Sequence, residues 1–135
     1  MTVTEPNDDD YRRLLEFRTG LRRFLHWSEE QAAAVDVSPA HHQLMLAIRG
    51  HPGPDAPTIG DVAAALLLRH HSAVGLVDRA VDAGLVARER DAADHRVVRL
   101  QLTPLGLRRL RALSREHLEE LRRLGPRFRS LWTDL

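Results

Sequence analysis

Apolar residues recur at helical spacing along the first third of the chain. Leu14, Phe17 and Leu21 lie three or four residues apart, and arginines separate them. This spacing places the apolar side chains on one face and predicts an amphipathic helix over about residues 11–34. The segment before it, residues 1–9, is acidic and polar, so we expect it to be disordered.

The sequence next predicts where two further helices begin. Ser38 precedes Pro39, the order of an N-cap and a first helical residue, and the helical pattern after them stops at Gly50. The proline-rich stretch 51–57 is predicted to be a stiff loop because proline cannot continue a helix. Thr58, with an aspartate three residues later, is predicted to cap a short third helix.

The hydrophobic pattern then changes its period. A fourth helix is predicted to begin at Ser72 and to end near Gly84, a residue type typical of helix C-termini. Residues 85–90 and 97–102 show the alternation of strands, and the polar stretch 91–96 lies between them. These segments predict a β-hairpin.

The last helix begins at Thr103 and Pro104, again with a cap before a proline. Its leucines recur near a seven-residue period up to Gly125 and Pro126, which are predicted to break the helix. Only six residues of the chain are aromatic, so Leu, Val and Ala must build most of the core. That composition favours helices over a β-sandwich.

A short helix, a tight turn, a second helix and a hairpin form the winged helix-turn-helix layout. We therefore predict a mainly α fold with a small β-hairpin wing, in one domain that spans residues 1–135. Residues 38–103 would form the winged helix-turn-helix DNA-binding lobe, and residues 10–37 and 104–135 the dimerisation helices. The alternative is that the terminal helices pack only within one chain, but their apolar surface exceeds what a small lobe can cover, so we expect a homodimer.

Composition narrows the function classes. The net charge is only +1, so a DNA-binding face must be locally basic. All 20 basic residues are arginines, whose planar guanidinium suits phosphates and guanine edges. Cysteine is absent, which excludes thiol-based sensing. No apolar run is long enough for a transmembrane helix and no signal-peptide pattern is present, so we expect no membrane partner and a location in the bacterial cytoplasm, on the nucleoid when DNA is bound.

Five short blocks, in this order and spacing, resemble the MarR family of bacterial regulators. They read TIGDVA (58–63), SAVGLVDR (72–79), AGLV (83–86), DHR (94–96) and LTPLG (102–106). The resemblance covers roughly residues 58–106, and the flanking helices fit the family's layout without carrying a motif. Two features depart from the family's pattern: the loop 50–57 is long and proline-rich, and Arg69, His70 and His71 stand at the start of the recognition helix.

The resemblance implies a dimer whose terminal helices intertwine. Each chain would place its recognition helix in the major groove of one half of a palindromic operator. Arg96 would enter the minor groove, and Asp94 would orient it through a charge-assisted pair. A small aromatic or phenolic effector would bind between the two lobes and release the DNA, as in a repressor, which is the commoner behaviour of the family.

The candidate DNA-binding residues lie around the recognition helix and in the wing. They are Arg69, His70, His71, Ser72, Ala73, Gly75, Arg79, Arg88, Arg90, Asp94, His95 and Arg96. Each has a plainer alternative: Ser72 a simple N-cap, the residues before it a solvated turn, Arg79 a surface pair with Asp78 or Asp82, and the wing residues a solvated strand face or a turn-stabilising pair.

The candidate effector-pocket residues are His26, Trp27, His42 and Met45, with core or dimer packing as the alternative. No cofactor and no metal site are expected. The adjacent histidine pairs 41–42 and 70–71 would point about 100° apart on a helix, so neither pair chelates a metal.

Two other function classes compete with DNA binding. An enzyme is disfavoured because no phosphate-binding glycine loop, nucleophile motif or metal triad is present. A winged-helix module that binds a protein partner without reading DNA remains the alternative, and salt-dependent DNA affinity would distinguish the two.

Overall fold

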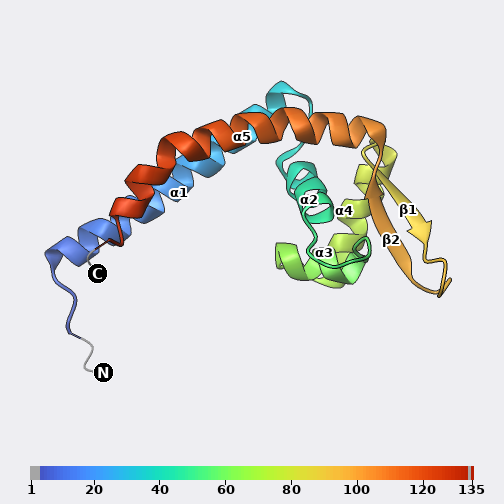
Figure 1. Ribbon diagram of the computed structural model, residues 1–135, viewed down its shortest axis with the longest axis horizontal. Helices are drawn as coiled ribbons and strands as arrows, with labels where there is room; N and C mark the ends of the chain where they lie inside the picture. The colour runs from blue at the N-terminus through green and yellow to red at the C-terminus, as the bar shows by residue number, and fades with distance from the viewer. Residues whose placement is uncertain (1–3, 134) are drawn as a thin grey trace.

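A computed structural model describes residues 4–133 and residue 135. In these residues the chain forms helices and one antiparallel hairpin in the order α1 (Asp8–Ala34), α2 (Pro39–Arg49), α3 (Ile59–Leu66), α4 (His70–Asp82), β1 (Val86–Arg90), β2 (Val98–Leu102) and α5 (Pro104–Ser130) (Figure 1). The prediction of a mainly α fold with a small β-hairpin wing is confirmed.

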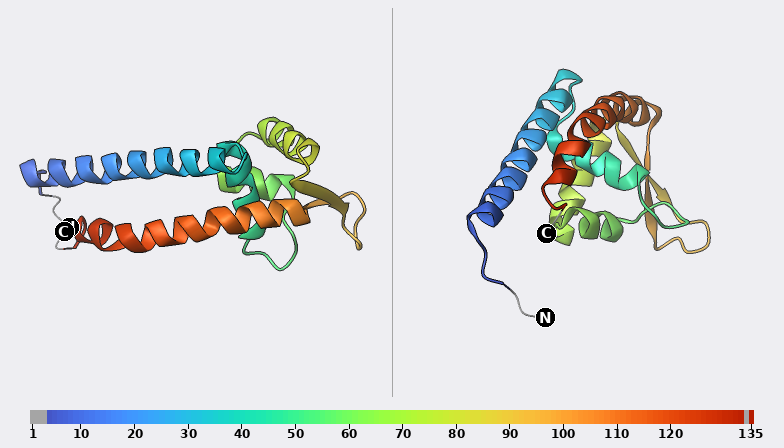
Figure 2. Two further views of the ribbon diagram at one scale, coloured as in Figure 1. Left: turned by 90° about the horizontal axis from the view of Figure 1, so that it is seen from above. Right: turned by 60° about the vertical axis from the view of Figure 1, so that its left-hand side comes forward.

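The molecule has a compact part and an extended part. Helices α2, α3 and α4 and the hairpin gather into one unit, which we call the lobe. Helices α1 and α5, which we call the arm, run alongside each other and project far beyond the lobe (Figures 1 and 2). No helix among the described residues carries an apolar stretch long enough to cross a bilayer.

The core lies in the lobe and reaches the first turns of α5. Its largest fully buried side chains are aliphatic or methionine: Leu44, Met45, Val62, Val77, Leu85, Val86, Leu100 and Leu113. No aromatic residue belongs to this buried set, as the composition predicts. The aromatic rings instead lie along the arm, where they contact one another between α1 and α5.

The first helix begins earlier than the hydrophobic pattern predicts. The Asn7 side chain accepts a hydrogen bond from the Asp10 N–H (3.0 Å), and the Asp10 carboxylate accepts one from the Asn7 N–H (2.9 Å). This reciprocal cap starts α1 at Asp8, so the expectation of a disordered start is wrong for residues 8 and 9. Residues 1–3 of that prediction lie outside the described residues.

The last helix continues through the predicted break at Gly125 and Pro126. Helix α5 ends only at Ser130, with Pro126 inside it. The part of α5 beyond the expected end includes Phe128, whose ring packs edge-to-face on Phe17 of α1 with centroids 6.1 Å apart. Tertiary packing thus outweighs the loss of one backbone hydrogen bond at proline.

The hairpin is fastened to the lobe on its outer edge. Strands β1 and β2 pair in a register that sets Val86 opposite Leu102 and Arg90 opposite Val98. On the other side of β2, the Leu100 N–H donates to the carbonyl of Pro57 (2.8 Å). Thr58, just after the 51–57 loop, forms an isolated β-bridge with Arg99, so this segment lies along the outer edge of β2.

Candidate nucleic-acid interface

The helix-turn-helix consists of α3, a three-residue turn and α4. Thr58 caps α3 by accepting a hydrogen bond from the Asp61 N–H (3.2 Å), while the Asp61 carboxylate accepts one from the Thr58 N–H (3.0 Å). This cap confirms the predicted start of the helix, and the Thr58 N–H lowers the pKa of Asp61. Leu67 ends α3 in the left-handed region (φ 54°) and turns the chain toward α4.

Helix α4 begins at His70, two residues before the predicted start. The extended backbone of Arg69 (φ −68°, ψ 150°) makes Arg69 the N-cap, and no side chain bonds the first turn of this helix. Ser72 is therefore the third helical residue and not a cap, which corrects the prediction. The free N–H groups of this turn, together with the helix dipole, favour an anion such as a phosphate.

The side chains at the start of α4 divide between solvent and core. Arg69, His70, His71 and Ser72 are exposed. Ala73 is only 1% exposed and packs inside the lobe, so its side chain is unavailable to DNA and its inclusion among the contact residues is corrected.

Arg79 and Gly75 form a pair along α4. The Arg79 side chain folds back over Gly75, where an added Cβ would lie 3.3 Å from Arg79 Nη1. Among the described residues, Arg79 forms an ion pair with neither Asp78 nor Asp82. The plainer alternative of a surface ion pair therefore does not apply. Half-buried Gly75 thus leaves room for an exposed guanidinium on the recognition helix.

The two arginines of β1 both have partners within the protein. Arg88 pairs with Asp78 of α4, which ties the base of the wing to the recognition helix. Arg90 donates from Nη1 to the His95 carbonyl (2.9 Å) and closes the wing turn. Both predicted contact residues therefore stabilise the wing, and any contact with DNA would have to share or replace these bonds.

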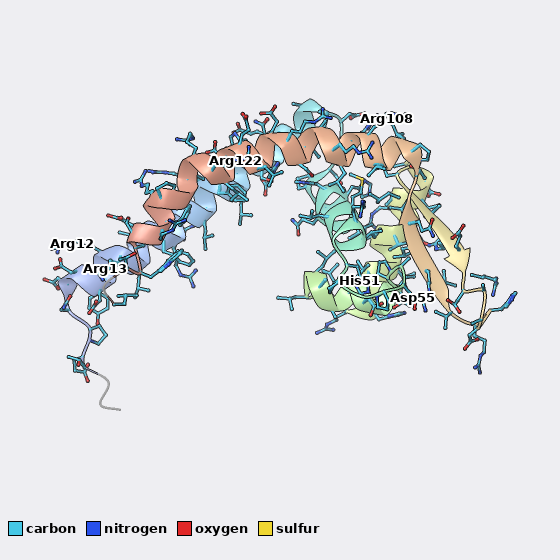
Figure 3. All side chains as sticks on the ribbon, in the orientation of Figure 1. Arg12, Arg13, His51, Asp55, Arg108 and Arg122 are labelled. Atoms are coloured by element: carbon cyan, nitrogen blue, oxygen red, sulfur yellow. The ribbon has the colours of Figure 1, made fainter. Side chains whose placement is uncertain are left out.

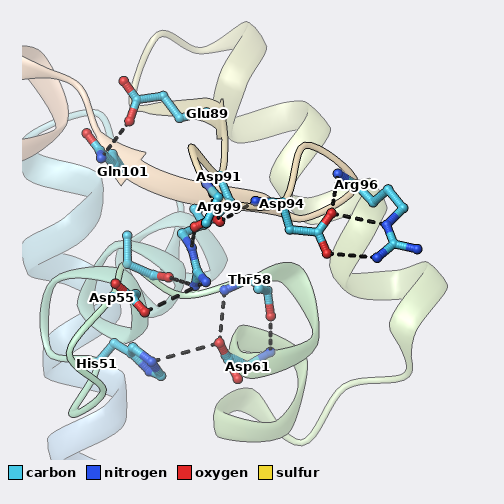
Figure 4. Close-up of polar contacts among 12 residues, drawn as sticks. His51, Asp55, Thr58, Asp61, Glu89, Asp91, Asp94, Arg96, Arg99 and Gln101 are labelled. Carbon is cyan, nitrogen blue, oxygen red and sulfur yellow. Dashed lines mark hydrogen bonds and ion pairs between the residues drawn. The ribbon is translucent and has the colours of Figure 1, made fainter.

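Arg96 stands out at the tip of the wing. Its Nε and Nη2 each donate to one oxygen of Asp94 at 3.1 Å, and its backbone N–H donates to Asp94 as well (3.1 Å) (Figure 4). The Arg96 side chain is nevertheless 91% exposed. Hydrogen bonds from Arg96 hold the pKa of Asp94 below its usual value, so the carboxylate that orients the guanidinium stays ionised at neutral pH.

Comparison with known proteins identifies this arrangement. Residues 35–97, from the end of α1 to the wing, match the model of the MarR family. The chain is similar to the MarR family over this segment, which is somewhat less than half of its length. No curated protein sequence matches it significantly.

Solved structures of MarR-family and related regulators share the fold. A DNA complex of MepR from Staphylococcus aureus has a TM-score of 0.70 at 20% identity, covering 84% of this chain and 82% of MepR. AbsC of Streptomyces coelicolor, a MarR family transcriptional regulator, has a TM-score of 0.71 at 22% identity, covering 99% of this chain and 86% of AbsC. At this sequence identity the similarity shows only that the fold is shared. The alignment with AbsC covers nearly the whole chain, so the shared fold includes the arm.

The candidate effector residues lie in different places in the structure. His26 is exposed and pairs with Glu30 on the surface of α1 (2.8 Å). Met45 is fully buried in the core. Trp27 lines a cleft of about 520 Å³ between α1 and α5, whereas His42 is buried beneath α1 at the junction with the lobe. Of the four candidates, only Trp27 lines this cleft, and its role in binding an effector stays a prediction.

An aromatic and polar cluster that the sequence did not mark occupies that junction. His117 of α5 lies at its centre, with ring centroids 4.9 Å from Trp27 and 4.8 Å from His42. Its Nδ1 donates to the Leu113 carbonyl (2.7 Å), and its Nε2 forms a hydrogen bond with the Ser28 hydroxyl (2.6 Å). Burial, and then the neighbouring His117, lower the pKa of His42.

Metal-ligating groups do not cluster in the part of the chain that the structure describes. No three His, Asp or Glu side chains come together there in a way that would hold a metal ion.

Proposed function

We propose that this protein is a transcription regulator that binds a palindromic operator as a homodimer, with α4 in the major groove and Arg96 in the minor groove. The observation that carries this proposal is the geometry of Arg96. Its guanidinium is exposed yet held by a bidentate carboxylate at the tip of a hairpin that is tied to α4 through Arg88. A pre-oriented guanidinium suits a narrow groove, where negative potential concentrates.

The start of α4 supports the same assignment. It combines uncapped N–H groups with exposed Arg69, His70 and His71, although the net charge of the chain is close to zero. Arg69 thus places a positive charge, and the two histidines place polar rings, at the start of a helix of the right width for the major groove.

The arm supports the dimer. Large apolar side chains remain exposed along both of its helices or just after them: Tyr11, Leu14, Leu15, Leu21, Leu25, Leu118, Leu121 and Trp132. Exposure of so many apolar residues on one elongated surface is typical of an interface that is covered by another chain. A symmetric dimer would also present two copies of α4 and the wing to the two halves of a palindrome.

Replacing Leu121 with glutamate tests the dimer. Leu121 is half exposed on α5, so each of the two copies in a dimer can bury only its remaining half, about 1–1.5 kcal/mol of apolar burial. The glutamate adds the cost of placing a charge at the interface. We expect the dimer dissociation constant, measured by sedimentation, to rise by at least about a hundredfold. The matched control is Leu46→Glu at a similarly exposed leucine of α2, which should leave the dimer intact. Equal masses for the wild type and Leu121→Glu would contradict a dimer formed through this face.

Salt-dependent DNA binding tests the function itself. Fluorescence anisotropy would follow binding to a labelled duplex from the region upstream of the protein's own gene, with a scrambled duplex as control. If six to ten phosphates are contacted, affinity should fall by roughly 10³–10⁵ between 50 and 200 mM salt. A DNA affinity that changes with neither the salt concentration nor the duplex sequence would instead favour a winged-helix module that binds a protein partner.

The cleft between α1 and α5 is the place where an effector would be sought. Phe24 and Trp27 line it together with three arginines and two glutamates, Glu16 and Glu120. Arg123 pairs with Glu120, so the cleft offers aromatic faces beside the positive charge of Arg23 and Arg127. We infer that an aromatic acid is the best-matched class and that it would weaken repression. A thermal-shift screen should show a Tm that rises with the concentration of such an acid, and Trp27→Ala should remove the rise. An unchanged Tm across the class would exclude it.

A further inference from the structure

Arg99 joins the wing to the loop that precedes α3. It lies in the middle of β2, and its side chain is only 24% exposed. Its Nε donates to Oδ1 of Asp91 in the wing turn (2.7 Å), and its Nη1 donates to the carbonyl of Ala56 (2.8 Å). Nη2 lies 3.8 Å from a carboxylate oxygen of Asp55 (Figure 4). One guanidinium thus spans from the 51–57 loop to the base of the wing turn.

Asp91 links the Arg99 guanidinium to the backbone at the tip of the wing. Its Oδ2 accepts hydrogen bonds from the backbone N–H groups of Ala93 (3.1 Å) and Asp94 (2.9 Å), while Oδ1 accepts the bond from Arg99. The Arg99 bond, followed by these N–H groups, lowers the pKa of Asp91, so it is ionised at neutral pH. The backbone held in this way belongs to Asp94, whose carboxylate holds Arg96.

The loop at the other end of the connection is rigidly placed. Pro57 accepts the Leu100 N–H, and Thr58 forms a β-bridge with Arg99. Thr58 is also the N-cap of α3, so the loop is continuous with the helix-turn-helix. The long proline-rich loop therefore has a role that its sequence does not reveal: it provides the fixed partner for Arg99.

We propose that Arg99 and Asp91 are positioning residues that hold the wing turn, and with it Arg96, in a fixed place relative to α3 and α4. Neither residue needs to contact DNA. The inference rests on the proposed DNA-binding function and adds that the operator affinity gained from Arg96 depends on this internal chain of bonds.

Replacing Asp91 gives the first test, because its charge and its positioning role predict opposite changes in DNA affinity. Asp91→Asn removes a negative charge near the DNA-binding face, so electrostatics alone would tighten DNA binding. An amide cannot accept from Arg99 and from the turn N–H groups with the strength of a carboxylate, so the positioning role predicts the opposite. With a duplex selected by the wild-type protein from a random-sequence pool, we expect Asp91→Asn to weaken binding about tenfold. Equal or tighter binding would overturn the proposal.

A double-mutant cycle separates positioning from general stability and charge. Arg99→Ala should weaken binding to the same duplex about tenfold in the wild-type background and leave it nearly unchanged in Arg96→Ala, because the residue to be positioned is then absent. Additive losses would show that Arg99 acts through charge or folding and would overturn the proposal. Asp91→Asn in the Arg96→Ala background provides the same readout if Arg99→Ala does not fold.

Gln101→Ala is the matched control. Its amide donates to Glu89 across the same hairpin (2.8 Å), on a path that does not reach Arg96. Gln101→Ala should leave the DNA affinity unchanged in both the wild-type and the Arg96→Ala backgrounds. A tenfold loss of affinity for Gln101→Ala would overturn the specific role of Arg99 and Asp91. If the selection yields no duplex, the proposed function fails. If the wild type binds and Arg96→Ala weakens binding while the cycle is additive, only this inference fails.

Discussion

Replacing Arg96 with alanine is expected to weaken operator binding by about 1–3 kcal/mol per half-site, and by about twice that for a dimer on two half-sites. The side chain is 91% exposed, so its removal costs no core packing. Among the described residues its side chain bonds only to Asp94, through paired 3.1 Å contacts. The loss should therefore appear in DNA affinity and leave the Tm of the free protein nearly unchanged.

The base composition of the flanking DNA gives this prediction a second readout. A guanidinium in the minor groove gains most where the groove is narrow, as in A-tracts. Arg96→Ala should thus lose more affinity on duplexes with A/T-rich flanks than on duplexes with G/C-rich flanks. Arg96→Lys keeps the charge but loses the bidentate fit to Asp94, and we expect an intermediate affinity.

Arg122→Ala is the matched control for charge. Arg122 is an exposed arginine of α5, on the arm and far from the wing (Figure 3). Its removal takes away the same unit of charge and should leave affinity at physiological salt almost unchanged, since distant exposed charges are screened. Equal losses for the two variants would mean that Arg96 contributes only to the overall charge.

Local signals were sufficient to predict most of the fold. Ser38-Pro39, Thr58 and Thr103-Pro104 each begin a helix where the capping rule places it, because a cap acts over three residues. The errors occur where distant parts of the chain decide the outcome. Helix α5 passes through Pro126, where Phe128 packs against α1, and no pattern within α5 reports that contact.

The candidate site could be predicted only in part for the same reason. Asp94 and Arg96 are two residues apart, so the sequence itself indicates their pairing. Arg99 reaches across 43 residues to Ala56, and strand alternation gives no sign of that bond. Ala73 lies on the buried face of α4 with Leu76, Val77 and Ala80, and the packing of α4 in the lobe, which the local sequence does not report, decides which face is buried.

Gly106 connects the lobe to the arm, and replacing it with alanine is the second large expected effect. Gly106 is buried in the first turn of α5, where Thr103 Oγ1 accepts its N–H (3.0 Å) and donates to the Gly84 carbonyl (2.5 Å). These hydrogen bonds hold the start of α5 in close contact with Leu85, the residue before β1. An added Cβ would lie 2.1 Å from the carbonyl oxygen of Leu85. The contact is with backbone, so no side chain can rotate away to relieve it.

We expect Gly106→Ala to lower the free energy of unfolding by about 3 kcal/mol or more, since overpacking against backbone must displace α5 from the lobe. At a fixed protein concentration this corresponds to a loss of about 10 °C in Tm, measured by calorimetry or circular dichroism. The matched control is Gly60→Ala in α3, where the new Cβ would lie 3.6 Å from Thr58 Oγ1 and the helix gains up to about 1 kcal/mol from losing a glycine. A Gly106→Ala protein as stable as the wild type would show that α5 can shift without cost. The glycine of the LTPLG block would then have no packing reason to stand at this position.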